Sequence, residues 1–132
     1  MSKYLDKAKE LRKRTDVHYN CAQGVLIPFA DELGLGEDLA FRMGNNFGSG
    51  MKMGSTCGAV TGALMALGLA GVTDTLPLIR KVKSNHGGMI DCRDLLRVNA
   101  QTAVPKKEHC DGMVYELVQM TEEILREQGK IK

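Results

Sequence analysis

The feature that most constrains the fold is a glycine-rich stretch at residues 44–62, which begins as a loop and ends as the start of an apolar helix. Four of its glycines recur at every fourth position: Gly50, Gly54, Gly58 and Gly62. Where the chain is helical, this spacing places the glycines on one bare face, against which another backbone can pack closely. The stretch therefore predicts close-packed helices, with a helix from Cys57 to about Leu69 at the centre.

The start of this central helix predicts a reactive thiol. Ser55 or Thr56 can cap the helix, because a side-chain oxygen there can accept a hydrogen bond from a free first-turn amide. Cys57 then lies at the positive end of the helix dipole, which favours the thiolate over the thiol. Because its loop is the most open, we expect Cys57 to be the attacking thiolate if the protein exchanges thiols.

The rest of the chain also has helical spacing of its apolar residues, and no stretch alternates with a period of two. Asn20 is a good cap for a second helix, in which Pro28 should cause a kink or an early end. We predict an all-α fold in one domain, residues 1–132, as a compact bundle of about six to seven helices with a glycine-rich loop leading into a central helix. The expected helices cover residues 3–14, 21–33, 37–46 and 57–69, a fifth between Thr75 and Gly87, then 92–98 and 108–128.

Composition and charge narrow the function classes. Aromatic residues make up only 5% of the chain, and methionine and glycine are frequent, which suits close-packed helices. The formal net charge of +2 does not favour nucleic-acid binding, and the basic face of the first helix is expected to be solvated. The longest apolar run, about 15 residues, is too short to span a bilayer, and the N-terminus lacks the apolar segment of a secretory signal. We therefore expect a cytoplasmic protein that binds neither nucleic acid nor membrane.

The four cysteines each fall within about the first turn of a predicted helix: Cys21, Cys57, Cys92 and Cys110. Cysteines in a reducing compartment are more often metal ligands or redox thiols than structural disulfides. No Cys-x-x-Cys occurs, which argues against a thioredoxin-type motif, a zinc ribbon and a c-type haem site. Any shared site must therefore form where helix ends meet. Four thiolates together suit an iron–sulfur cluster or zinc, whereas pairs suit reversible disulfides.

We predict that these four cysteines are the catalytic and metal-binding residues. Gly54, Gly58 and His86 are predicted to line the same site as cofactor-binding residues. His18 and His109 lie near Cys21 and Cys110 in the sequence, but an exposed or capping histidine is the simpler interpretation of each. A phosphate-binding loop is disfavoured, because Met51 precedes Lys52 where the P-loop has glycine.

Around its cysteines the sequence resembles a family of small prokaryotic proteins known by its cysteine pattern, C_GCAxxG_C_C, and described as redox proteins. The resemblance covers roughly residues 17–125. Its carriers are Asn20-Cys21-Ala22-Gln23-Gly24-Val25, the run Gly54-Ser55-Thr56-Cys57-Gly58-Ala59-Val60-Thr61-Gly62-Ala63-Leu64, Cys92-Arg93-Asp94-Leu95-Leu96, and Cys110. The family label reads Gly-Cys-Ala, whereas this chain reads Cys57-Gly58-Ala59, and we align Cys57 with the motif cysteine. The resemblance implies redox activity with the four cysteines as functional residues, and it leaves the substrate and the metal open.

Two hypotheses of different classes follow. In the first, the protein is redox-active and acts with an unidentified redox partner, as an oxidoreductase or as an electron carrier. Its four cysteines then perform thiol–disulfide chemistry with no cofactor, or hold an iron–sulfur cluster or another thiolate-bound metal for electron transfer. In the second, the chain is a structural or interaction module, an all-α homodimer that packs its glycine stripe against the partner and buries inert cysteines. Four cysteines allow three pairings, and the sequence does not select among them.

Overall fold

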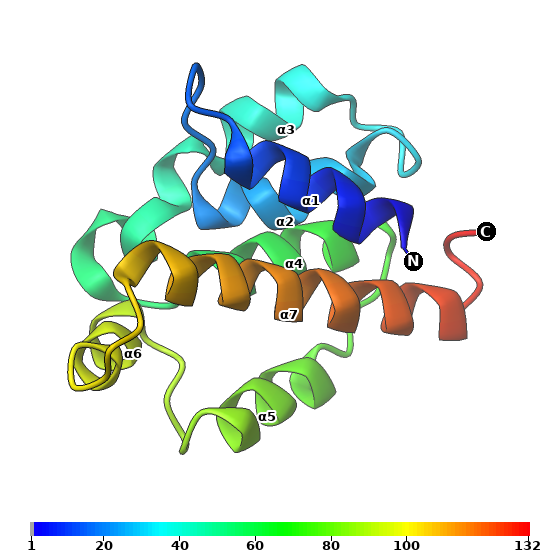
Figure 1. Cartoon of the computed structure of the whole chain (residues 1–132). Coiled ribbons are helices and arrows are strands. Elements are labelled where there is room, and N and C mark those ends of the chain that lie inside the picture. The colour runs from blue at the N-terminus through cyan, green and yellow to red at the C-terminus, as the bar shows by residue number, and fades with distance from the viewer. Residues whose placement is uncertain (1) are drawn as a thin grey trace.

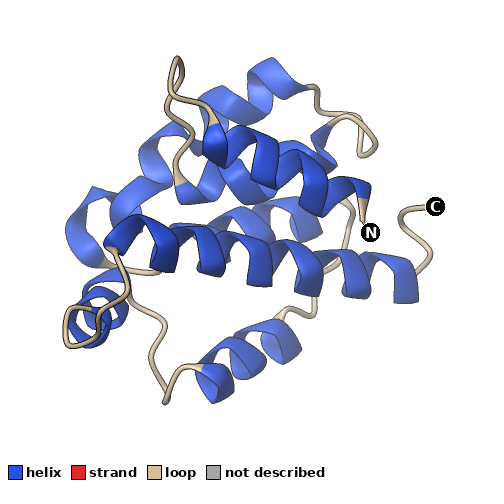
Figure 2. Ribbon diagram, viewed as in Figure 1, coloured by secondary structure: helices blue, strands red, loops and turns tan. Residues whose placement is uncertain are grey.

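The computed structural model describes residues 2–132, a range that contains seven α-helices and no β-strand, only one isolated β-bridge between Thr56 and Asp91. Figure 2 shows helices joined by loops throughout. The all-α prediction is therefore confirmed. The helices are α1 Lys3–Lys13, α2 Cys21–Ala30, α3 Glu37–Gly44, α4 Gly58–Leu69, α5 Leu76–Asn85, α6 Cys92–Asn99 and α7 Lys106–Glu127.

Helices α2 and α4 form the centre of the bundle, and each makes its most extensive contact with the other. The long helix α7 and helix α1 lie across this pair, as Figure 1 shows. Asn20 caps α2 as predicted, through a reciprocal capping box with Gln23 in which each side chain bonds the other residue's amide. Every aliphatic and aromatic side chain of α2 except that of Pro28 is buried, and the helix continues two residues beyond this proline before it ends at Ala30.

Two glycines of the predicted stripe allow α4 to approach α2 closely. A Cβ atom at Gly62 would lie 2.5 Å from the carbonyl oxygen of Ala22, and one at Gly58 would lie 3.2 Å from the Cβ of Cys21. Gly50 and Gly54 do not continue the stripe, because they bound a separate, irregular helical segment, Gly50–Gly54, in which both have left-handed backbones, with φ of 61° and 70°. The stripe is therefore shorter than predicted, and it faces a helix of the same chain.

The ends of the central and last helices differ from those expected. Neither Ser55 nor Thr56 caps α4, whose N-cap residue is Cys57 itself. The reason is that Thr56 pairs with Asp91, just before α6, and that the Ser55 carbonyl accepts a hydrogen bond from the Cys92 amide at 2.7 Å. Helix α7 begins at Lys106 rather than Glu108, so Cys110 lies one turn inside it.

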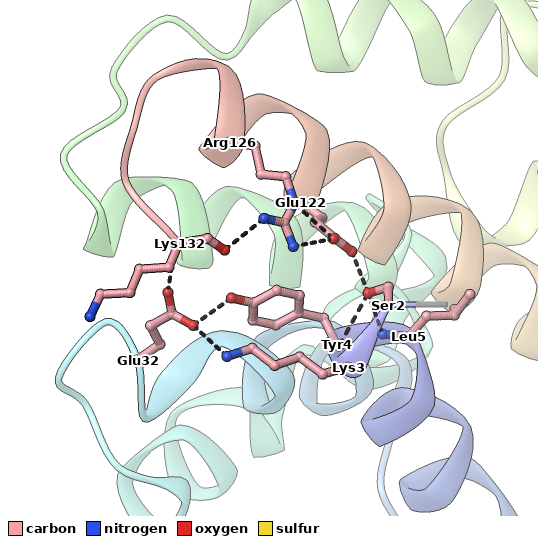
Figure 3. Close-up of polar contacts among 8 residues, drawn as sticks. All are labelled: Ser2, Lys3, Tyr4, Leu5, Glu32, Glu122, Arg126 and Lys132. Carbon is pink, nitrogen blue, oxygen red and sulfur yellow. Dashed lines mark hydrogen bonds and ion pairs between the residues drawn. The ribbon is translucent and has the colours of Figure 1, made fainter.

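The two chain ends meet at one end of the bundle, where polar side chains join α1, α2 and α7 (Figure 3). Glu32, just after α2, accepts a hydrogen bond from the Tyr4 hydroxyl and another from the Lys132 amide at 3.0 Å. On α7, Glu122 accepts from the Ser2 hydroxyl and pairs with Arg126 at 2.9 Å. Cys110 lies near the opposite end of α7, where the helix meets the N-terminal ends of α2, α4 and α6 that carry the other cysteines.

Within residues 2–132, none of the helices combines the length and the apolar character that crossing a bilayer requires.

Candidate functional site: a cavity lined by four cysteines

All four cysteines line one small cavity of about 60 Å³. It lies where the N-terminal ends of α2, α4 and α6 meet the first turns of α7, at the end of the bundle away from the chain termini (Figure 1). All four thiols are free. The remaining lining residues are Ser49, Gly58, Leu95, Leu96, Lys106, His109 and Met113.

Cys57 and Cys92 are positioned by a short antiparallel pairing of the chain. The amide of Cys57 donates to the Ile90 carbonyl at 3.0 Å, and the amide of Cys92 donates to the Ser55 carbonyl at 2.7 Å. Gly50 packs under this pairing, because a Cβ there would lie 2.4 Å from the Ser55 oxygen and 2.8 Å from the Cβ of Cys92. Two cysteines that are 35 residues apart in the sequence are thereby fixed on neighbouring segments.

The pKa values of Cys21 and Cys110 are shifted in opposite directions. A hydrogen bond from the Cys21 thiol is the largest influence on Cys110 and lowers its pKa to about 6, and the positive charges of Arg12 and Lys106 act in the same direction. The same hydrogen bond, together with burial, raises the pKa of Cys21, which therefore keeps its proton. Within this pair, Cys110 is therefore the thiol with the lowered pKa.

The sequence predicts that Cys57 is the open cysteine, whereas the structure shows it buried. Cys57 is 6% exposed, and burial raises its pKa to about 11. The amides of Ala59 and Val60 at the start of α4 lower the pKa of Cys57, as expected at a helix N-terminus. The cost of removing the thiolate charge from water is larger and raises the pKa. Burial also raises the pKa of Cys92. The lowered pKa falls on Cys110, the cysteine that lies one turn inside its helix.

Two cations of this site are absent from the sequence-based prediction. Arg12 is 9% exposed, and its guanidinium donates to Asp111 at 2.7 Å and to the Tyr19 carbonyl at 2.8 Å. Lys106 lines the cavity from the start of α7. Helical spacing could have revealed Arg12, because it lies four residues after the buried Ala8 and seven after the buried Leu5.

The other sequence-predicted site residues fall in different places. Gly58 lines the cavity, whereas Gly54 and His86 lie outside its lining, Gly54 facing the Arg93 side chain. His86 instead pairs with Glu116 of α7 at 2.9 Å. His109 does line the cavity, and burial followed by the influence of His86 lowers its pKa. His18 lines a larger cleft beside the cavity, on the side of Cys21 and Cys110.

Four thiols have the donor chemistry that soft metals and iron–sulfur clusters prefer. Within residues 2–132, however, no three His, Cys, Asp or Glu side chains are arranged to hold one metal ion. The cysteines therefore match such a centre in chemistry, but they would have to move closer together to bind it.

Comparison with known protein families identifies the family of the chain. A family model described as "Putative redox-active protein (C_GCAxxG_C_C)" matches residues 19–124, a span that holds all four cysteines. No curated protein and no solved structure matches the chain. Because the match extends over most of the 132 residues, the chain belongs to the C_GCAxxG_C_C family.

Proposed function

We propose that this protein is a thiol–disulfide redox protein in which Cys110 is the attacking thiolate and Cys21 is the resolving thiol. The shared position of Cys21 and Cys110 in the lining of both the small cavity and the larger cleft, next to Arg12 and Lys106, is the observation that carries the proposal, and the lowered pKa of Cys110 supports it. A thiolate is the nucleophile of disulfide exchange, and an attacking thiol reacts best when its pKa is near the ambient pH. A pKa of about 6 meets this condition at neutral pH.

The exchange has two steps. The Cys110 thiolate attacks one sulfur of a partner disulfide, so that a mixed disulfide forms and the first partner sulfur leaves as a thiolate. Cys21 then loses its proton to the departing thiolate or to solvent and attacks the Cys110 sulfur, which releases the second partner thiolate. The protein dithiol gives up two electrons and becomes the Cys21–Cys110 disulfide, while the partner disulfide is reduced to two thiols. The reverse sequence oxidises a partner dithiol.

The test is equilibration of the reduced protein in dithiothreitol buffers of graded potential, followed by counting of free thiols. We expect the natural protein to lose two thiols in one two-electron transition. Cys57→Ser should behave in the same way, whereas Cys110→Ser should lose none in this range. Oxidation of Cys110→Ser at an unchanged potential would overturn the assignment. Four thiols that stay unreactive throughout would favour the structural module with inert cysteines.

A second candidate function is electron transfer through a thiolate-bound metal or iron–sulfur cluster, and the shared cavity of all four cysteines favours it. Such a centre needs all four thiolates at once, whereas exchange needs only one pair. Protein purified without air distinguishes the two through its visible absorption, its iron, sulfide and zinc content, and its free-thiol count. A brown protein with iron and sulfide would support the second candidate. Colourless, metal-free protein with four titratable thiols would support exchange.

A further inference from the structure

A second and larger cavity adjoins the cysteine pair. This cleft has a volume of about 420 Å³, and Cys21 and Cys110 belong to its lining as well as to that of the smaller cavity. Ligand sites for small molecules have volumes of about 300–1,000 Å³, so the cleft can hold one. The two sulfurs that exchange electrons in the proposed function are therefore reachable from a space large enough for a substrate.

The cleft is lined by basic side chains. Five of its lining residues are basic, Arg12, Arg14, His18, Lys106 and Lys107, and no Asp or Glu is among the described residues that line it. Two carboxylates stand next to the cleft: Asp111 bonds to Arg12 and Lys107, and Asp16 bonds to Arg14. Four permanent cations therefore face two carboxylates and the Cys110 thiolate, which leaves one positive charge in excess before His18 is counted.

One cation without a carboxylate partner lies beside the sulfurs. Lys106 pairs with no carboxylate within residues 2–132, and it lines both the cleft and the cysteine cavity. Arg14 is held at the cleft by two bonds to Asp16, at 2.6 and 3.0 Å, and by one to the Tyr19 hydroxyl at 3.2 Å. A cleft with one sign of charge concentrates ligands of the opposite sign and raises their association rate.

We propose that this basic cleft is the substrate site of the cysteine pair and that it takes small disulfides carrying carboxylates. This inference rests on the proposed thiol–disulfide function and adds the class of substrate to it. The carboxylates bind among Arg14, Lys106 and Lys107, and the disulfide bond lies against Cys110. One turnover converts such a disulfide into two carboxylate-bearing thiols and leaves the protein as the Cys21–Cys110 disulfide.

The test is a single-turnover reaction of the reduced full-length protein with three disulfides of similar size. These are 3,3′-dithiodipropionate with two carboxylates, bis(2-hydroxyethyl) disulfide with no charge, and cystamine with two ammonium groups. Each rate is divided by the rate of the same disulfide with 2-mercaptoethanol, which removes differences in intrinsic reactivity. At pH 7.5 and low salt we expect the anionic disulfide to react at least about tenfold faster than the cationic one, and the ratio to approach one in 0.5 M salt.

Two variants that each remove one positive charge show whether the cleft causes the preference for the anionic disulfide. Arg14→Gln should lower the ratio of anionic to cationic rates severalfold. Lys81→Gln removes the same charge from α5, on which Lys81 pairs with Glu123, and should leave the ratio unchanged.

Two outcomes overturn the proposal, and they differ in what else they overturn. If the neutral disulfide yields the Cys21–Cys110 disulfide but the three normalised rates are equal, the cleft is not a site for anions and the proposed exchange function stands. If none of the three disulfides oxidises the protein, both the substrate class and the exchange function fall.

Discussion

The cysteines of this protein show how strongly the surroundings of one chemical group decide its reactivity. Cys57 lies at a helix N-terminus and is nevertheless held as a thiol, because its burial costs more than the helix end provides. Cys110 lies one turn inside a helix and is half-buried, yet its neighbours are a thiol donor and two cations. A thiolate forms where hydrogen bonding and charge together outweigh the loss of water.

Replacement of Cys21 by alanine should raise the pKa of Cys110, because it removes the donor that stabilises the thiolate. We expect the midpoint for alkylation of Cys110 by iodoacetamide to move from about 6 upward, toward the ordinary thiol value of ~8.5. At pH 7 the rate should fall by about two- to threefold, because the roughly 30-fold loss of thiolate exceeds the roughly 10- to 18-fold gain in intrinsic nucleophilicity.

Peptide mass spectrometry over a pH series measures this midpoint for Cys110 alone. Cys57→Ala is the control, since Cys57 is not among the influences on the pKa of Cys110, and the midpoint should stay in place. An unchanged midpoint in Cys21→Ala would show that the thiol–thiol hydrogen bond does not set the reactivity of Cys110.

At the scale of elements, helix α4 and its approach loop position the site. The bare face of α4 at Gly58 and Gly62 brings Cys57 close to the start of α2. In the segment before it, Ser49, Met51 and Lys52 adopt left-handed backbones although none is glycine. Such conformations cost on the order of 1–3 kcal/mol each and persist where the surrounding structure holds them, often at functional sites.

Two alanine substitutions in α4 test whether its close contact with α2 holds this arrangement. Gly62→Ala places a Cβ 2.5 Å from the Ala22 carbonyl oxygen, so a backbone must shift, and we expect the free energy of unfolding to fall by about 2–3 kcal/mol. Gly68→Ala in the same helix meets no atom within 4 Å, and it should raise the free energy of unfolding by up to about 1 kcal/mol. Denaturant unfolding of the reduced proteins measures both. Equal effects of the two substitutions would contradict the close contact.

For the whole molecule, the sequence predicts the bundle better than the site. Periodic apolar residues, the Asn20 cap and Pro77 in the first turn of α5 are local signals, and the helices follow them. The sequence contains no local cysteine motif, so it predicts that any site shared by the four cysteines forms where helix ends meet. The structure has such a cavity. Which cysteine has the lowered pKa was not predictable, because the shift depends on burial and on Arg12, which reaches the site from a helix remote in sequence.

The other end of the bundle should contribute to stability independently of the cysteines. Tyr4 is 1% exposed, and its hydroxyl donates to Glu32, which connects the start of α1 to the end of α2. We expect Tyr4→Phe to lower the free energy of unfolding by about 1 kcal/mol. In a double-mutant cycle with Glu32→Gln, the two losses should be less than additive by about 0.5 kcal/mol or more. Strict additivity would show that this contact does not join the elements.

The most direct test of the account is to identify the first disulfide that forms when the reduced, metal-free protein is oxidised by a slight excess of a small disulfide. Free thiols are blocked at intervals, the chain is digested, and the linked peptides are identified by mass spectrometry. The structure predicts that Cys21 and Cys110 are linked first, while Cys57 and Cys92 remain blocked as free thiols. A first disulfide that joins Cys57 to Cys92, or either of them to Cys110, would contradict the account.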